Sequence, residues 1–429
     1  MRAVAGGRSS AVRYGPIVRL FGRKRQEILV WQQLAHPLSV QMPSGASAKA
    51  VVSPLWRAGS AGEEGHGCGL PSRAMSTTPT HERRLTESID LTSPGGSRLN
   101  PGGTRLNPDA IGWSSTPLQR GNLRGNWGRN KRWDYWAVLA GDLVVSATYA
   151  DIDYLGLADV WWADLAAGDH GGVNVVSPLG RGLELPERPG TTPLTLRHKL
   201  LDLTIDDAGN GTTTISARWT EPDGSSAELE AHIALPDDHE SLNVVIPWSE
   251  KRFQYTSKHQ ARPATGYLTI GGMTRVLEDA LRGAWGVLDV GRGRWPYSTR
   301  WNWGGGAGRA SGDGPVVGLQ IGGKWTEGTG LTENGVIIDG RLTKIGAELG
   351  WDYSWDNPMR PWRVTDPSGH LELELTPRYD KHSRTNVGVL STETHQVFGD
   401  WSGWVADDDG QRVEFDDLQG FAEESRSRW

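Results

Sequence analysis

The stretch SAELEAHIAL, residues Ser226–Leu235, decides the fold class of this 429-residue chain. Apolar and polar side chains alternate strictly along it: Ala227, Leu229, Ala231, Ile233 and Leu235 face one way, and Glu228, Glu230 and His232 face the other. Successive side chains of a β-strand point to opposite faces, so this period of two predicts a half-buried strand. The stretch HLELELTP, residues 370–377, repeats the pattern with leucines opposed by glutamates.

Turn signals separate runs of this kind: Asn210-Gly211, Asp223-Gly224, Asp339-Gly340, Ser368-Gly369 and Asp409-Gly410. Asn-Gly and Asp-Gly pairs suit hairpin turns that need a positive φ. One helix is expected, at MTRVLEDALRGAW, residues 273–285. Hairpins in series without alternating helices predict an all-β fold. At this length we expect two tandem lipocalin-like antiparallel barrels or sandwiches.

Glycine and tryptophan are both abundant, with 57 and 21 residues, whereas phenylalanine occurs 5 times. Tryptophan combines a large apolar ring with one N–H donor that needs a partner when it is buried. A chain rich in both residues favours short strands with tight turns. It also suits the walls of a semi-polar cavity.

Charge divides the chain near Met75. Residues 1–74 carry 10 Lys/Arg and 3 Asp/Glu, and the remainder carries 35 and 48. An acidic body argues against nucleic acid and against anionic membrane as partners, because both need clustered cations. The one cysteine, Cys68, leaves the body without a disulfide or a thiolate metal site. With no apolar run of about 18 residues, we expect a cytoplasmic protein without stable membrane insertion.

Composition and sequence pattern divide the chain into four expected segments. Residues 1–74 are expected to be a disordered extension and a start-site artefact, with Met75 as the natural start. Residues 75–124 form a polar arm that holds a short echo, GGSRLNP followed by GGTRLNP. A first β-domain is expected over 125–262 and a second over 263–429, divided after KRFQYTSKHQARPATG.

The second half carries a string of motifs: GRGRWPYSTRWNWG (Gly291–Gly304), WTEGTGLTEN (Trp325–Asn334), PWRV (Pro361–Val364), HQVFGDWSG (His395–Gly403), LQGFAE (Leu418–Glu423) and a final RW. In this order they resemble the bacterial domain-of-unknown-function 2804 family, over roughly Gly112–Trp429. That family brings no established activity. A looser resemblance is to calycin-like two-barrel proteins, such as hydroxyneurosporene-synthase-type hydratases and tocopherol cyclases. It implies a cavity for a hydrophobic molecule.

The run RWPYSTRWNWGGGAG, residues 294–308, supplies the candidate ligand contacts. On a strand, Trp301 and Trp303 share one face, with Trp295 and Tyr297 in phase with them. The alternative is ordinary core packing beside a Gly-rich hairpin. The predicted ligand-binding set is Arg294, Trp295, Tyr297, Arg300, Trp301, Trp303 and Asn334.

Three residues are candidates for proton transfer. Asp289 precedes the aromatic run, and burial against tryptophan would raise its pKa and suit a general acid. The alternative is a structural pair with Arg292 or Arg294, or a turn cap. Glu333 could be a second acid or base or a loop residue. His395 could shuttle a proton or be a hydrogen-bonded strand residue.

No metal site and no cofactor are expected, because the sequence has no HxH or HExxH pattern and no dinucleotide or phosphate loop. The favoured function is a cavity protein that acts on a small hydrophobic ligand, as a hydratase or cyclase of an isoprenoid or lipid. A non-catalytic lipid carrier and a carbohydrate-active protein are the alternatives. Whether the chain is an enzyme, and its oligomeric state, stay open.

Overall fold

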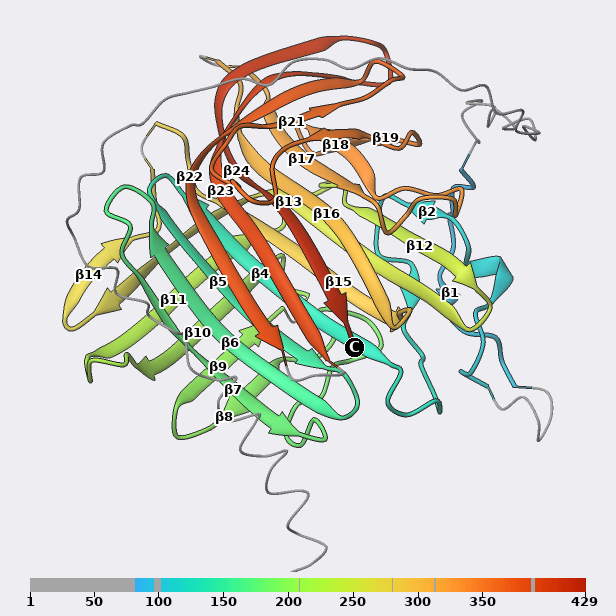
Figure 1. Ribbon diagram of the computed structural model, residues 1–429, viewed down its shortest axis with the longest axis horizontal. Coiled ribbons are helices and arrows are strands. Elements are labelled where there is room, and N and C mark those ends of the chain that lie inside the picture. Colours follow the sequence, from blue (N-terminus) through green and yellow to red (C-terminus); the bar gives the residue numbers. More distant parts are fainter. Residues whose placement is uncertain (1–81, 96–101, 208, 280, 312–313, 387–389) are drawn as a thin grey trace, which may run out of the picture.

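The computed structural model describes residues 82–95, 102–207, 209–279, 281–311, 314–386 and 390–429. The predicted extension 1–74 lies outside this range. Nearly all regular structure among the described residues is β (Figure 1), which confirms the predicted all-β fold. Two large curled antiparallel sheets make up the body, one of thirteen strands and one of nine.

The larger sheet follows the order β7-β6-β5-β4-β15-β13-β11-β10-β9-β8, with β2, β12 and β14 attached beside that path. Its strands are β2 (Trp113–Ser114), β4 (Lys131–Ala140), β5 (Leu143–Asp151), β6 (Leu155–Asp164), β7 (His170–Pro178), β8 (Leu194–Arg197), β9 (Leu201–Asp206), β10 (Thr212–Thr220), β11 (Ser226–Ala234), β12 (Leu242–Ser249), β13 (Arg252–Ile270), β14 (Met273–Val276) and β15 (Trp285–Arg294).

The smaller sheet follows the order β19-β18-β17-β16-β24-β23-β22-β21-β20. Its strands are β16 (Ser298–Arg309), β17 (Val316–Gly323), β18 (Asn334–Ile338), β19 (Arg341–Ile345), β20 (Gly350–Asp352), β21 (Trp362–Thr365), β22 (Leu371–Asn386), β23 (Ser391–Ala406) and β24 (Arg412–Arg428). A short parallel pair, β1 (Ile89–Asp90) with β3 (Gln119–Arg120), lies in the arm before β4.

The alternating runs become strands for the expected reason. Leu229 and Ile233 on β11 are buried in the core of the first sheet, while His232 between them is exposed. The leucines of β22 are buried in a second core, within the smaller sheet. A third apolar cluster joins the sheets, with Val287 from β15 and Trp303 from β16 packed on Phe398 and Phe421.

The prediction of a helix over residues 273–285 is wrong. Met273–Val276 form strand β14, which folds back antiparallel on Tyr267–Ile270 of β13. Gly271 and Gly272, both at positive φ, make the turn. Met273 and Leu281 are 76% and 94% exposed although Leu277 between them is buried, so the described apolar residues do not form the continuous buried stripe of a packed helix. Among the described residues, the single helical element is a 3₁₀ turn at Pro108–Ala110.

The chain passes from one sheet to the other between β15 and β16. The expected boundary at 262/263 falls inside β13, which is continuous from Arg252 to Ile270. Division into separate domains stays a prediction. In Figure 1 the red β22–β24 ribbons lie over the teal β4–β6 strands, so the two sheets face each other along these strands. No described helix is long and apolar enough to cross a membrane.

Candidate functional site

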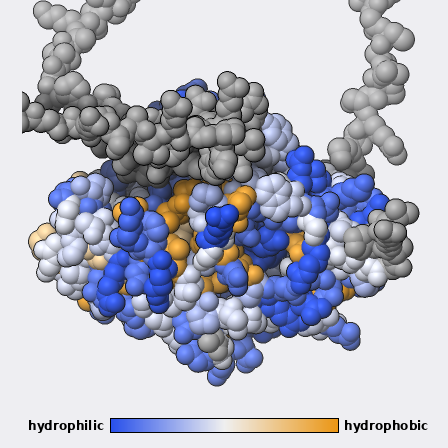
Figure 2. All heavy atoms as spheres, turned by 90° about the horizontal axis from the view of Figure 1, so that it is seen from below, coloured by the Kyte–Doolittle hydropathy of each residue, from blue (hydrophilic) through white to orange (hydrophobic). Residues whose placement is uncertain are grey.

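A cavity of about 420 Å³ lies where the two sheets face each other. Strands β4, β5, β6, β13 and β15 line it from the larger sheet, and β16, β22, β23 and β24 from the smaller one. Six tryptophans dominate the wall: Trp133, Trp295, Trp301, Trp303, Trp325 and Trp429. Aliphatic residues Ile152, Leu155 and Leu157 complete the apolar part. Figure 2 shows one face of the molecule where apolar residues gather at the centre inside a hydrophilic surround.

Five of the six tryptophans form one connected cluster, and the sixth, Trp303, packs on Tyr135 and Phe421. Trp295 stacks on Trp325, with ring centroids 5.1 Å apart, and meets Trp301 edge-on at 5.6 Å. Trp301 in turn stacks on Trp429 at 6.1 Å. The two-residue spacing on β16 places Trp301 and Trp303 on the same face, as the strand pattern predicts.

The indole N–H groups of five of these tryptophans have fixed acceptors, whereas Trp429 Nε1 is buried without a partner among the described residues. Trp295 Nε1 donates to Gln254 Oε1 at 2.8 Å, and Trp303 Nε1 donates to Gln320 Oε1 at 3.1 Å. A buried Trp needs such a partner. The N–H donors of these two tryptophans are therefore satisfied within the wall itself.

A buried lysine joins two carboxylates at one end of the wall. Lys258 Nζ lies 3.0 Å from Asp289 Oδ1 and 3.5 Å from Glu333 Oε2. It also lies 4.2 Å from the ring centroid of Trp303. The register of β13 with β15 places Lys258 directly opposite Asp289. Glu333 comes from the segment just before β18, where Trp325 Nε1 donates to its Oε1 at 2.5 Å.

Asp289 is held by three donors. Besides Lys258, Thr256 Oγ1 donates to its Oδ1 at 3.2 Å and Trp133 Nε1 to its Oδ2 at 3.1 Å. These donors engage both oxygens of the Asp289 carboxylate.

A third carboxyl group, Glu423 on β24, enters from the smaller sheet. Its register partner on β16 is Trp303, and Trp301 Nε1 donates to its Oε1 at 2.7 Å. Burial raises the pKa of Glu423 to about 7, although the Trp301 hydrogen bond and Lys258 oppose that rise. The charge of Asp289 acts in the same direction as burial.

Glu333 behaves in the same way. Burial raises its pKa to about 7, against the opposing effect of Lys258. Burial alone would lower the pKa of Lys258, but the attraction of Asp289 and Glu333 outweighs it, so the pKa is raised. The cluster therefore places the buried Lys258 among three carboxyl groups, and burial raises the pKa of two of them, Glu333 and Glu423, to about 7.

Residues 82–429 match the model of the family described as domain of unknown function (DUF2804). The chain belongs to the DUF2804 family. No protein of curated function matches its sequence. Among solved structures, the crystal structure of CghA is similar at 10% identity with a TM-score of 0.40, over 76% of this chain and 98% of that one. Kievitone hydratase from Nectria haematococca is similar at 12% identity with a TM-score of 0.41, over 71% and 90%.

Five of the predicted site residues of this DUF2804 chain meet at the cavity: Asp289, Trp295, Trp301, Trp303 and Glu333. Asp289 pairs with neither of the arginines near it in sequence. Arg292 Nη1 instead lies 2.7 Å from Asp134 Oδ1. The roles assigned to the five residues stay predictions.

The other predicted residues lie elsewhere. Arg294 is buried, and its guanidinium donates to Asn130 Oδ1 and to the carbonyl oxygens of residues 103, 104 and 124. Tyr297 is 48% exposed. Arg300 is bonded to Glu424 at the surface. These contacts fix loops and strand ends, and none of the three side chains is part of the cavity lining.

Asn334 and His395 are likewise outside the lining. Asn334 accepts from the backbone N–H of Gly322 at 2.6 Å and donates to Ala347 O at 3.0 Å, so it ties β18 to its neighbours. His395 Nδ1 lies 2.8 Å from Asp380 Oδ2. It faces the opposite side of β23 from the cavity-lining Gln396.

Sequence reasoning missed Lys258 and Glu423. Each is a charged residue inside an otherwise strand-like run, FQYTSKHQ and LQGFAE, and that interruption was the available signal. Lys381 on β22 was also missed. Its Nζ lies 4.1 Å from the Trp161 ring centroid, and burial lowers its pKa despite Asp159 and Glu423.

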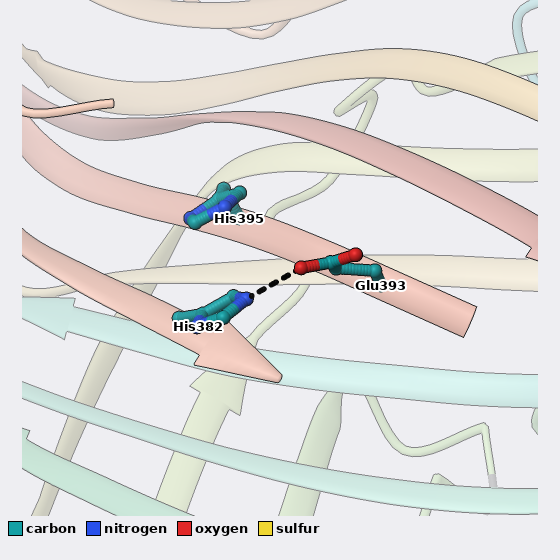
Figure 3. A group of neighbouring side chains, drawn as sticks. All are labelled: His382, Glu393 and His395. Carbon is teal, nitrogen blue, oxygen red and sulfur yellow. Dashed lines mark hydrogen bonds and ion pairs between the residues drawn. The ribbon is translucent and has the colours of Figure 1, made fainter. Parts of the chain in front are cut away.

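One group in the described residues could hold a metal ion: His382, Glu393 and His395 on β22 and β23 (Figure 3). The sequence was expected to hold no metal site because it lacks closely spaced ligands. This group is instead formed by residues on two neighbouring strands, β22 and β23.

Proposed function

We propose that this DUF2804 protein binds a small hydrophobic molecule in the tryptophan-lined cavity and protonates one of its double bonds. The reaction would be a hydration or a cyclisation of an isoprenoid or lipid. One observation carries the proposal: Glu423, a carboxylic acid with a pKa raised to about 7, lies in the cavity wall beside the tryptophans. A general acid works best when its pKa lies near the working pH.

Glu423 is the better proton donor of the three carboxyl groups. Glu333 is 2% exposed and is held by Trp325 and Lys258, which leaves it little access to a ligand. Asp289, the donor favoured from the sequence, has both carboxylate oxygens engaged by Lys258, Thr256 and Trp133. Glu423 is fixed by Trp301 and has no ion-pair partner within 4 Å among the described residues.

The proton moves from the Glu423 carboxyl group to one alkene carbon, which leaves a carbocation at the other. The π face of Trp301 stabilises a cation within about 6 Å of its centroid, whereas Trp303 already has Lys258 Nζ 4.2 Å from its centroid. In a hydration, water adds to the cation and its surplus proton passes to the carboxylate of Glu423 or Asp289. In a cyclisation, a second double bond of the ligand adds instead, and a neighbouring C–H bond returns the proton.

Two alternatives make different demands on the cavity. A carrier needs only the apolar wall, and the buried cluster of Lys258, Asp289 and Glu333 would then serve stability alone. A carbohydrate would stack on tryptophan, but its hydroxyl groups need polar partners around the whole ring. The aliphatic side of the wall favours a hydrophobic ligand over a sugar.

The test begins with native mass spectrometry of freshly purified protein and extraction of the bound molecule. That molecule is then incubated with protein in D₂O, and deuterium on carbon is measured. Wild-type protein should introduce one deuterium per turnover. The Glu423→Gln variant should bind the molecule equally, seen as tryptophan quenching, and lose about 10²–10⁴-fold in rate.

The exposed Glu414→Gln on the same strand is the matched control and should match wild type. Binding by wild-type protein without any deuterium incorporation would refute the catalytic proposal and leave the carrier. Equal turnover by wild type and Glu423→Gln would refute the role of Glu423.

A further inference from the structure

The β22–β23 pair brings together three metal-ligating side chains that are dispersed in the sequence. His382 lies directly opposite His395 in the strand register, and Glu393 is two residues before His395 on the same face of β23. One ligand atom from each of the three lies within 4.8 Å of the others. Figure 3 shows the two imidazoles side by side, with the Glu393 carboxylate beside His382.

A neighbouring carboxylate orients His395. Asp380 Oδ2 lies 2.8 Å from His395 Nδ1, so this nitrogen donates its proton and the lone pair of Nε2 remains free. Metal-bound histidines commonly make this hydrogen bond, which fixes the tautomer and raises the basicity of the ligand. The His395 ring is also held edge-on by Trp355 at 4.6 Å and stacked on His382 at 4.2 Å.

We propose that His382, Glu393 and His395 bind one divalent first-row transition-metal ion, with Zn²⁺ as the best fit. Two imidazoles and one carboxylate are a recurrent protein set for Zn²⁺, at metal–ligand distances of about 2.0–2.2 Å. Because the two imidazole rings lie parallel at 4.2 Å and each nitrogen lone pair lies in its ring plane, the exposed His382 ring would turn so that both lone pairs meet at the metal. The contact of His382 Nε2 with Glu393 Oε1, now 3.2 Å, would be replaced by the shared metal.

One competing charge borders the site. Arg384 Nε lies 3.8 Å from Glu393 Oε2, but 65% of the Arg384 side chain is exposed. An exposed pair of this kind is worth little, at most about 1 kcal/mol. The arginine can therefore turn into solvent when a metal takes its place.

The metal site is independent of the proposed function. The residues that alternate with its ligands, Ser383 and Thr394, line the cavity, so the ligands lie on the opposite face of the same two strands. A metal bound there would clamp β22 to β23 behind the cavity wall without touching the ligand in it.

Calorimetric titration of tag-free, chelator-treated protein with ZnCl₂ tests the proposal. Wild-type protein should bind one Zn²⁺ per chain, and bound Co²⁺ should show visible absorption bands of a histidine-ligated site. His382→Ala removes an exposed ligand and should lower affinity at least 100-fold. Asp380→Asn should lower it about 10–100-fold, since it disturbs only the orienting hydrogen bond.

His232→Ala is the matched control, because His232 is an exposed strand histidine 3.7 Å from Glu230. It should bind like wild type. Absence of saturable Zn²⁺ binding in wild type, or His382→Ala binding as wild type does, would overturn the proposal. Asp380→Asn with unchanged affinity would overturn the orienting role of Asp380.

Discussion

Replacement of Glu423 by glutamine should make the protein more stable at alkaline pH. Glutamine is nearly isosteric, and its amide oxygen can accept the same hydrogen bond from Trp301. It cannot ionise. The variant therefore avoids the cost of placing a carboxylate in the apolar wall, and the size of the gain reports that cost.

The magnitude follows from the pKa. Glu423 has a pKa of about 7 in the folded protein against an ordinary 4.5, and burial is the main cause. Because the folded pKa is raised, the folded protein binds this proton more tightly than the unfolded chain does. The stabilisation is complete below pH 4.5 and is lost as pH rises to 7. The difference corresponds to about 3 kcal/mol, as an order of magnitude.

Urea unfolding followed by circular dichroism at pH 5 and pH 8 measures this difference. At pH 8 the free energy of unfolding of Glu423→Gln should exceed that of wild type by up to about 3 kcal/mol. At pH 5 the two proteins should differ by less than about 1 kcal/mol, since Glu423 is then protonated when folded. Glu414→Gln, exposed on β24, should change stability by no more than about 0.5 kcal/mol at either pH.

A variant that is less stable than wild type at pH 8, or one whose stability difference is the same at both pH values, would refute the reasoning. Glu423 would then be an ionised structural residue near neutral pH. The proposal of a proton donor would lose the observation on which it rests.

Three further changes test the surroundings of Glu423. Lys258→Met leaves buried carboxyl groups without their cation and should lower the free energy of unfolding at pH 8 by about 3–5 kcal/mol in the same urea assay. Trp301→Phe removes a hydrogen bond that lowers the pKa of Glu423, so the pH midpoint above which turnover falls should rise; an unchanged or lower midpoint would contradict this. Gly291→Ala places a Cβ 2.2 Å from the Trp133 ring and should cost about 1–3 kcal/mol in calorimetry, whereas an unchanged melting temperature would show that the ring yields freely.

The strands were predictable because their signal is local. Alternation along Ser226–Leu235 reports which side of the backbone is buried, and it needs no knowledge of the partner strand. The wrong prediction of a helix at residues 273–285 concerns a stretch without such alternation. There the Gly271-Gly272 turn returns β14 onto β13, and backbone pairing outweighs the helix propensity of residues such as Met273.

The site was predictable only along a single strand. Trp301 and Trp303 were placed on one face because both lie on β16. The partner of Asp289 was assigned to arginines nearby in sequence, whereas the register of β13 supplies Lys258. Glu423 lies more than a hundred residues from Trp301, and only the pairing of β16 with β24 joins them. Sequence carries no comparable signal for register between distant strands.

The glycines that follow the tryptophans of β16 explain why a cavity forms at this place. A Cβ on Gly305 would lie 2.7 Å from Gln260 Nε2, and one on Gly318 of β17 would lie 3.0 Å from the Cβ of Ala261. Gln260 and Ala261 belong to β13, in the opposite sheet. The sheets therefore meet almost backbone to backbone where β16 and β17 carry glycine. A few residues earlier, the indole rings of β16 hold the same sheets apart. The cavity lining accordingly includes Trp301 and Trp303 of β16 but none of the glycines that follow them on that strand.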